Sequence, residues 1–346
     1  MSCCDETTAK VPNTDVSRRS MLKGATVLAG VLPALKTTGA GAQGKTIKLA
    51  YCSQILCGVP YEVARSAGLY KKHGVNVELV YTRGGSAAMQ ALVGGAVDYA
   101  ATALDVAIQA YAKGAEIKRF VTTGRLPLFA LVTAPKNAES LKTVKDLEGK
   151  TVGVSALGNA DHALTLYLLR QANANADKVQ FATMGVNLLE ALRLGQIDAG
   201  LVQEPALTLL QKSGARVIVN GMDLKDATQY LGGAYEFMGV SVRAKEMDER
   251  KPEMMAVAKA LAEALTELRK MDGRQLVDAL PKEMTTGLNL QEFGEILVRY
   301  RDSLYPETVA IDLNSSKRVQ QSLVVGGLLK ADAKIDGLHD TSIVGG

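Results

Sequence analysis

Two patterns of apolar and polar residues, one typical of strands and one typical of helices, alternate along the chain from residue 46 onward. Short apolar runs bounded by glycine and polar residues predict buried strands, and apolar residues spaced three and four apart predict helices. Strands that alternate with helices favour a mostly parallel sheet covered on both faces. Pro60 suits a first helical turn, and Gly68 suits a helix end. The first unit has predicted strands at 46–52, 75–82, 97–103 and 117–124, and predicted helices at 59–74, 83–95 and 105–114.

The same alternation begins again near residue 146. Two α/β units in one chain predict a protein with two lobes, which the length of 346 residues also favours. The second unit has predicted strands within 146–156 and at 178–185, 197–203 and 215–220, and predicted helices at 160–173, 187–195 and 204–214. An extended return is expected at 235–246, and residues 252–330 are largely helical, with apolar faces of helical period over 252–271 and 290–304.

One short segment occurs twice. Gly95 and Asp98 of "MQALVGGAVDYA" reappear as Gly195 and Asp198 of "LEALRLGQIDAG", at the same offset (198 − 98 = 100 residues). We expect each glycine to end a helix in the left-handed conformation, and each aspartate to accept hydrogen bonds from nearby loop amides. Two matching units place the carboxyl ends of their strands on both sides of one crevice, which is where ligands bind in open α/β sheets.

The first residues read as an export signal. Arg18 and Arg19 precede an apolar run, 25–35, and "AGA" then offers small residues for cleavage after Ala42. The stretch "SRRSMLKG" resembles the twin-arginine export signal, with Met21 where phenylalanine is usual. We therefore expect residues 1–42 to be removed and the mature protein to be soluble in the periplasm.

Composition narrows the function further. The net charge is +4, and no basic run is interleaved with aromatic residues, so nucleic acid is not an expected partner. The three histidines are scattered, which predicts no metal site, and we expect no cofactor and a monomer. Cys52 and Cys57 remain after cleavage; the spacing leaves open whether they form a disulfide or stay as two buried thiols.

The order of several segments resembles a known family. These segments are "GLYKKHGVNVELV", "GGSAAMQALVGGAVDYA", "DLEGKTVGV" and "ALRLGQIDAGLVQEP". Together they resemble periplasmic binding proteins of the nitrate/taurine/alkanesulfonate class of ABC importers, over about residues 46–338. The resemblance implies a type II periplasmic-binding fold of two α/β lobes. It also implies that the protein captures a small solute by lobe closure and delivers it to a membrane permease.

The resemblance divides the chain into parts. Residues 45–127 and 245–338 are expected to form lobe 1, and residues 128–244 lobe 2. Hinge strands are expected near 128–134 and 237–244, and residues 339–346 are expected to be a tail.

Ligand contacts are expected at loops that follow strands. Backbone amides at the starts of the helices after Gly84 and Asn159 favour an anion, and Arg125 could hold a carboxylate or sulfonate with two hydrogen bonds. Glu204 could bind a cationic group or cap the helix that follows it. We therefore expect a small organic anion, such as a sulfonate or a carboxylate. The candidate ligand-binding residues are Ser53, Gln54, Cys57, Gly84, Gly85, Ser86, Thr102, Arg125, Ser155, Asn159, Ala160, Asp161 and Glu204.

Two other functions remain as alternatives. "SQILCGVP" resembles the nucleophile region of aromatic-sulfinate desulfinases, and Cys57 matches their cysteine. Those enzymes also have a histidine and an arginine in the next strand-to-helix region, where this chain has Arg83 but no histidine. A thiol without an activating base is a poor nucleophile, so we do not expect an enzyme. The second alternative is a binding protein that docks on a sensor rather than on a permease.

Overall fold

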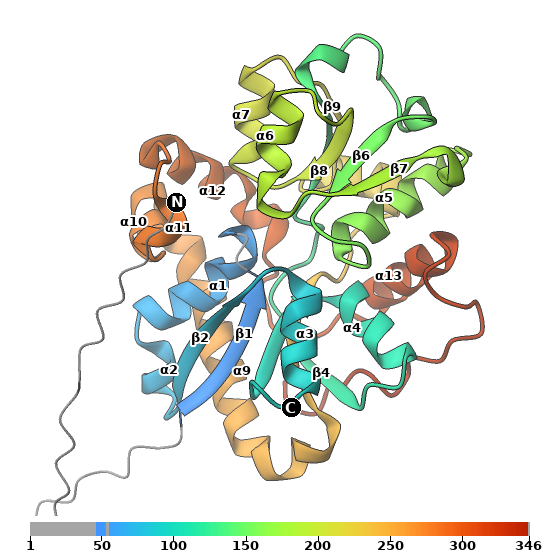
Figure 1. Ribbon diagram of the computed structural model, residues 1–346. Coiled ribbons are helices and arrows are strands. Elements are labelled where there is room, and N and C mark those ends of the chain that lie inside the picture. The colour runs from blue at the N-terminus through green and yellow to red at the C-terminus, as the bar shows by residue number, and fades with distance from the viewer. Residues whose placement is uncertain (1–45, 53–54, 345–346) are drawn as a thin grey trace, which may run out of the picture. The chain divides into compact units, whose positions relative to one another are not determined.

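Two five-stranded sheets organise the computed structural model of the protein, which describes residues 46–52 and 55–344 (Figure 1). The strand order is β2-β1-β3-β10-β4 in the first sheet and β7-β6-β8-β5-β9 in the second. The first sheet contains β1 (Thr46–Cys52), β2 (Asn76–Thr82), β3 (Tyr99–Ala103), β4 (Ile117–Thr122) and β10 (Met238–Arg243). The second contains β5 (Ala130–Thr133), β6 (Thr151–Val154), β7 (Gln180–Thr183), β8 (Ala199–Val202) and β9 (Val217–Asn220).

The two sheets share one topology. In the first, β1 pairs in parallel with β2 and β3, and β10 runs antiparallel between β3 and β4. In the second, β6 pairs in parallel with β7 and β8, and β5 runs antiparallel between β8 and β9. Each sheet therefore contains one antiparallel strand; in the first sheet this is β10, which follows all the strands of the second sheet in the sequence. The predicted class, α/β with two mostly parallel sheets, is confirmed.

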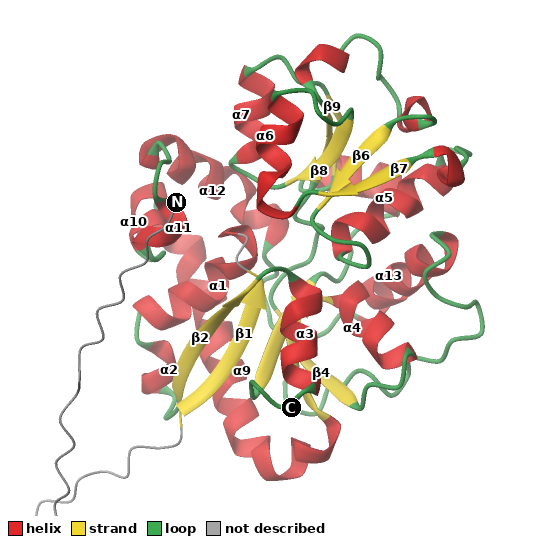
Figure 2. Ribbon diagram, viewed as in Figure 1, coloured by secondary structure: helices red, strands yellow, loops and turns green. Residues whose placement is uncertain are grey.

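Helices surround both sheets (Figure 2). We call each sheet, with the helices packed on it, the first or the second lobe; within the described chain, α13 packs against both α4 and α5 and so contacts both lobes. The long helix α9 packs against α1 and α2. The helices are α1 (Ile55–Ser66), α2 (Leu69–Lys72), α3 (Gly85–Val93), α4 (Leu104–Ala112), α5 (Ala160–Gln171), α6 (Leu188–Arg193), α7 (Ala206–Lys212), α8 (Leu224–Leu231), α9 (Met247–Lys270), α10 (Gly273–Asp278), α11 (Lys282–Thr285), α12 (Leu290–Leu304) and α13 (Leu313–Val325).

The repeated segment plays the same structural role twice. Gly95 follows α3 with φ 79° and Gly195 follows α6 with φ 66°, so both take the predicted left-handed conformation. The Oδ2 of Asp98 accepts a hydrogen bond from the amide of Lys48 at the start of β1, at 2.8 Å. Its counterpart Asp198 accepts one from the amide of Thr151 at the start of β6, at 2.9 Å. The left-handed helix ends are confirmed, and both aspartates accept from backbone amides, although these amides belong to strands rather than to loops.

The helix after β1 differs from the prediction. It begins at Ile55 rather than at residue 59, so Pro60 lies in the helix interior and not in its first turn. An interior proline cannot donate to the carbonyl four residues earlier. Here the Tyr305 hydroxyl, from the far end of the chain, donates to the Leu56 carbonyl instead, at 2.9 Å. Sequence spacing cannot reveal a partner so distant along the chain.

Two connections join the lobes, and they are hydrogen-bonded to each other. Gly124 and Arg125 accept backbone hydrogen bonds from Phe237 and Tyr235, at 2.8 and 2.9 Å. The expected hinge strands near 128–134 and 237–244 correspond to β5 and β10, each of which is part of a sheet. The paired connections lie at 123–125 and 235–238, beside those strands. Which residues flex, and the lobe boundaries, stay predictions.

The two ends of the chain need separate comment. The predicted signal segment 1–42 lies outside the described residues. The expected tail, 339–346, begins in contact with the first sheet, because Asp340 donates a backbone hydrogen bond to Arg119 in β4. Across the helices that the structure describes, none has the length and apolar character needed to cross a bilayer.

Candidate ligand-binding site

A small cavity lies where strand ends of both sheets meet. Its volume is about 30 Å³, enough for one or two water molecules. Eight of the candidate residues line it, four from the first lobe and four from the second. They are Cys57, Gly84, Gly85 and Thr102, and Ser155, Asn159, Ala160 and Asp161. The sequence therefore predicted most of this wall.

The first-lobe wall combines a glycine turn with a buried hydroxyl. Gly84 has φ 108°, and a Cβ there would lie 2.8 Å from the Asn159 amide nitrogen, so only glycine fits. Thr102, at the end of β3, is fully buried, and its Oγ1 has no hydrogen-bond partner among the described residues. A buried hydroxyl without a partner is costly, which makes Thr102 a candidate ligand contact.

The second-lobe wall is a hydrogen-bonded network at the start of α5. The Asp161 carboxylate accepts from the amide and the hydroxyl of Ser155 and from the amide of His162. Asn159 in turn donates to the Ser155 hydroxyl, at 3.0 Å. The Asp161 carboxylate thus occupies part of the positive end of α5 that the sequence suggested for a ligand anion.

Several hydrogen bonds cross from one lobe to the other beside the cavity. Ser86 donates from its hydroxyl to Asn159 Oδ1 at 2.6 Å, and Gln109 donates to the carbonyl of Gly158 at 3.2 Å. Gln203 Nε2 lies 3.7 Å from the Cys57 sulfur. These contacts hold the strand ends of the two sheets together in this conformation. Ser86 does not line the cavity but closes it through Asn159.

The electrostatics of the cavity are acidic. Within the described part of the chain, no lysine or arginine lines it, whereas Asp161 does. Burial raises the pKa of Asp161 to about 6. Burial also raises the pKa of Asp105, in the first turn of α4, to about 7. Asp105 was not a candidate, because an acidic residue in a first helical turn is common and carries no specific signal.

A buried arginine lies behind the cavity wall. Arg119 in β4 donates to the carbonyls of Thr102 and Phe237, at 3.0 and 2.7 Å, and pairs with Glu236 at 3.3 Å. Both side chains are almost fully buried. Burial lowers the pKa of Arg119 and raises that of Glu236, while their mutual attraction opposes both shifts. This pair fixes the ends of β3 and β10 rather than facing a ligand.

Aromatic and apolar side chains complete the wall. Phe129 and Phe237 precede β5 and β10, and their rings meet edge to face with centroids 6.0 Å apart. Their position on the two connections between lobes is the signal that sequence reasoning could have used. The lining residues that the sequence analysis missed are Cys52, Ala103, Val106, Phe129, Phe237 and Met238.

The remaining candidates lie elsewhere. Arg125 donates to the carbonyls of Ser303 and Asp302 at the end of α12, at 3.1 and 2.7 Å, and does not line the cavity. Glu204 accepts from the amide and hydroxyl of Thr208, both at 3.0 Å, which is the capping role that the sequence allowed. Ser53 and Gln54 lie outside the described residues.

The two cysteines line the cavity as thiols. Cys52 and Cys57, both within the described range, are buried and not joined in a disulfide. Burial raises the pKa of Cys57 well above its ordinary value, and the neighbouring Cys52 adds to the effect. A protonated, buried thiol is a poor nucleophile.

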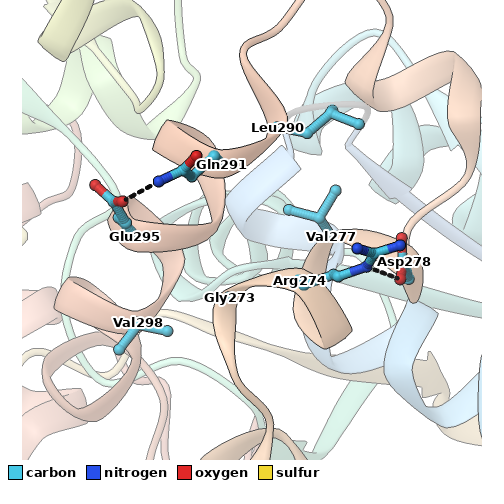
Figure 3. Close-up of a pocket in the computed structure, with 8 residues that line it drawn as sticks. All are labelled: Gly273, Arg274, Val277, Asp278, Leu290, Gln291, Glu295 and Val298. Atoms are coloured by element: carbon cyan, nitrogen blue, oxygen red, sulfur yellow. Dashed lines mark hydrogen bonds and ion pairs between the residues drawn. The ribbon is translucent and has the colours of Figure 1, made fainter.

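A larger hollow of about 740 Å³ lies between α10 and α12 (Figure 3). Its polar side chains are engaged within their own helices: Arg274 with Asp278 at 3.6 Å, and Gln291 with Glu295 at 3.3 Å. The Arg274 and Asp278 side chains are largely exposed. A specific ligand site needs polar groups that are buried and point toward one another. The smaller cavity has such groups, and the hollow between α10 and α12 does not.

Residues 59–270, more than half of the chain, match the model of one protein family, described as NMT1/THI5 like. The chain belongs to the NMT1/THI5-like family. No curated protein matches it.

Solved structures similar to this NMT1/THI5-like chain share its fold. A protein of Bordetella bronchiseptica RB50 has a TM-score of 0.78 at 23% identity, covering 86% of this chain and 95% of its own. The alkanesulfonate-binding protein SsuA of Xanthomonas axonopodis pv. citri, bound to MOPS, has a TM-score of 0.70 at 19% identity, covering 87% and 100%. The periplasmic nitrate-binding protein NrtA of Synechocystis PCC 6803 has a TM-score of 0.68 at 13% identity, covering 86% of each chain. The chain therefore has the periplasmic-binding-protein fold.

Proposed function

We propose that the protein is the periplasmic solute-binding component of an ABC importer. It captures a small organic anion in the cavity between its lobes and delivers it to a membrane permease. The twin-arginine-type segment at 1–42 directs export, and the mature protein is soluble. The single observation that supports this function is the cavity itself, which is built from strand ends of both sheets.

The size of the cavity implies movement. Sites for small molecules are typically about 300–1,000 Å³, so about 30 Å³ suits a conformation that must open before a solute enters. Few bonds hold the lobes together at the cavity: Ser86 to Asn159, Gln109 to Gly158, and Gln203 to Cys57. Away from the cavity, Lys212 of α7 also pairs with Glu292 of α12, and α13 packs against both α4 and α5. Hydrogen bonds like those at the cavity contribute roughly 1 kcal/mol each. A ligand that bridges the lobes replaces them and favours closure.

An anion is the ligand class to test first. The N-termini of α3 and α5 line the cavity, at Gly85 and Ala160, and a helix N-terminus favours negative charge. The Thr102 hydroxyl and the Asn159 side-chain amide can donate to anionic oxygens, whereas the Ser155 hydroxyl already donates to Asp161. Arg125, committed to α12, is not needed for this binding mode.

Mass spectrometry of small molecules released from the purified mature protein tests the ligand class directly. A thermal-shift panel of sulfonates, nitrate, carboxylates and pyrimidines then ranks candidates, because a ligand selective for the folded protein raises its unfolding temperature. A raised midpoint with an anion supports the proposal. A response to uncharged pyrimidines alone contradicts the anion class.

Closure is tested by small-angle scattering with Asn159→Ala. We expect the active anion to reduce the radius of gyration of the unmodified protein. Asn159→Ala removes a bond to Ser86 and a ligand donor, so affinity should fall roughly tenfold. The exposed Asn76, paired with Thr46 at the start of β2, supplies the matched control Asn76→Ala, which should bind normally. Equal loss in both variants would contradict a role for the inter-lobe bond.

Two alternatives have distinct readouts. If purified protein converts an aromatic sulfinate, the desulfinase-like function is correct, and Cys57→Ala should abolish turnover. If the ligand-loaded protein binds a sensor and no permease, the capture mechanism stands but its partner differs. The buried, protonated state of Cys57 and the cavity lining without a cation or histidine favour binding over catalysis within the described residues.

A further inference from the structure

Two buried carboxyl groups lie near the lobe boundary, one on α4 and one on α5. Asp161, 1% exposed, lines the cavity from α5 of the second lobe. Asp105, 2% exposed, lies in the first turn of α4, one residue before the lining residue Val106. Gln109, on the same helix, reaches the Gly158 carbonyl just before α5. Closure of the lobes therefore brings two acidic groups into one water-poor region.

The two carboxyls differ in how they are satisfied. Asp161 accepts three hydrogen bonds, from the amide and the hydroxyl of Ser155 and from the amide of His162. Asp105 Oδ1 has no partner in the part of the chain that the structure describes. A carboxylate needs hydrogen-bond donors around both oxygens, whereas a neutral carboxylic acid needs fewer of them. Asp105 is the group whose environment suits a proton.

Among the described residues, the cation that acts on Asp105 is Arg119, whose attraction opposes the rise in the Asp105 pKa but does not outweigh burial. Glu236, buried beside Arg119, also pairs with it. His162 and His339 are neutral near pH 7, since burial lowers the pKa of each, that of His339 to about 4. Tyr235, which also faces Asp105, hydrogen-bonds Ser322 and is held neutral by burial.

The other helices and strands around α4 add no counter-charge. On α13, Arg318 donates to the Ala234 carbonyl and the Ser315 hydroxyl, and Lys317 is exposed. On β10, Arg243 donates to the carbonyls of Leu92 and Val97 and pairs with Glu246. An anion entering this cavity therefore adds negative charge beside two buried acids, whose charge Arg119 offsets only in part because it also pairs with Glu236.

We propose that Asp105 and Asp161 form a proton-binding site, so that the protein takes up one proton when it closes over its anion. The inference rests on the proposed capture of an anion for its ligand, but the burial of the two carboxyls is a property of the protein itself. Neutralising one carboxyl removes the repulsion, and a protonated carboxyl in an apolar site can serve as a hydrogen-bond donor. The pair shares the proton as a coupled unit.

The direction of the pH effect follows from the raised pKa values of the two groups, about 7 and about 6. A carboxyl whose pKa is higher in the closed form favours closure when protonated. Anion affinity should thus be highest at low pH and fall as pH rises towards 7, levelling off above it. One proton taken up corresponds to a tenfold fall for each pH unit in the sloping range.

The ligand-free protein tests the site without any ligand. Both groups have a folded pKa above the unfolded value of about 3.9, so their contribution to stability declines as pH rises from about 4 to 7. We expect Asp105→Asn to flatten this decline in thermal unfolding between pH 4.5 and 7.5. The exposed Asp332 supplies the control, Asp332→Asn, which should keep the original profile. Identical profiles in all three proteins would overturn the proposal.

Proton uptake on binding is then measured by calorimetry in buffers of different ionisation enthalpy. Nitrate and methanesulfonate are the probes, because both stay anionic between pH 5.5 and 7.5. We expect about one proton per anion and roughly tenfold or greater loss of affinity across that range, with both effects reduced in Asp105→Asn. Affinity that is constant or rises with pH would overturn the proposal. If neither anion binds at any pH, the anion ligand fails, and the ligand-free profiles alone decide the proton site.

Discussion

Thr102 offers a substitution whose effects on stability and on binding should have opposite signs. Its side chain is fully buried at the end of β3, and Oγ1 has no hydrogen-bond partner in the described chain. Leaving a buried hydroxyl unsatisfied costs about 1–3 kcal/mol. Thr102→Val replaces the hydroxyl with a methyl group of similar size, so we expect the ligand-free protein to gain about 1 kcal/mol. For a chain of this length the unfolding midpoint should rise by about 2 °C.

Binding should respond in the other direction. If the ligand accepts a hydrogen bond from Thr102, its loss costs about 0.5–1.5 kcal/mol, or roughly two- to tenfold in affinity. Calorimetric unfolding and titration of the same two proteins measure both effects.

Thr133 is the matched control for this experiment. It is equally buried in β5, but its Oγ1 accepts a hydrogen bond from the amide of Arg216 at 3.0 Å. Thr133→Val should therefore lower stability by about 1 kcal/mol and leave binding unchanged. If Thr102→Val lowers the midpoint as Thr133→Val does, the hydroxyl of Thr102 is satisfied in solution and the reasoning is refuted.

Two further predictions concern the framework that holds the site. Asp198→Ala removes the acceptor for the Thr151 amide and should cost about 2 kcal/mol in denaturant unfolding, whereas a change within 0.5 kcal/mol would show that the repeated aspartate is dispensable. Gly239→Ala would drive a Cβ into the Val121 carbonyl and the Arg119 guanidinium, so we expect a loss of about 3 kcal/mol or a failure to fold; a well-folded, equally stable variant would contradict this packing.

The elements that depend on local pattern were predictable from the sequence. Apolar periodicity located β1 at its observed bounds, Thr46–Cys52, and the Gly-x-x-Asp repeat predicted both helix ends and both capping carboxylates. These features depend on residues close together in the chain. The glycines before α3 and the polar residues before α5 were likewise recognisable as site candidates, because the carboxyl ends of parallel strands mark the crevice.

The features that the sequence missed depend on distant partners. Arg125 had the right chemistry for an anion, but the carbonyls at the end of α12 take its donors, and no pattern near residue 125 reveals this. Pro60 has no N–H to donate to the Leu56 carbonyl within the helix. The Tyr305 hydroxyl donates to that carbonyl instead. The raised pKa of Asp105 arises first from burial and also from the charge of Asp161, which only the folded chain brings near it.

The position of β10 between β3 and β4 has a consequence for biosynthesis. All strands of the second sheet lie within residues 130–220, so a nascent chain can assemble it from one continuous stretch. The first sheet must instead wait for a strand that follows β3 by 135 residues (238 − 103), and until then β3 and β4 lack the neighbour that separates them. A mutation that keeps the second sheet unfolded also leaves a long unfolded segment before β10. The pairing of β10 with β3 and β4 should then be slower, because the entropic cost of bringing the ends of a segment together grows with its length. A mutation that destabilises the second sheet should therefore also slow the folding of the first.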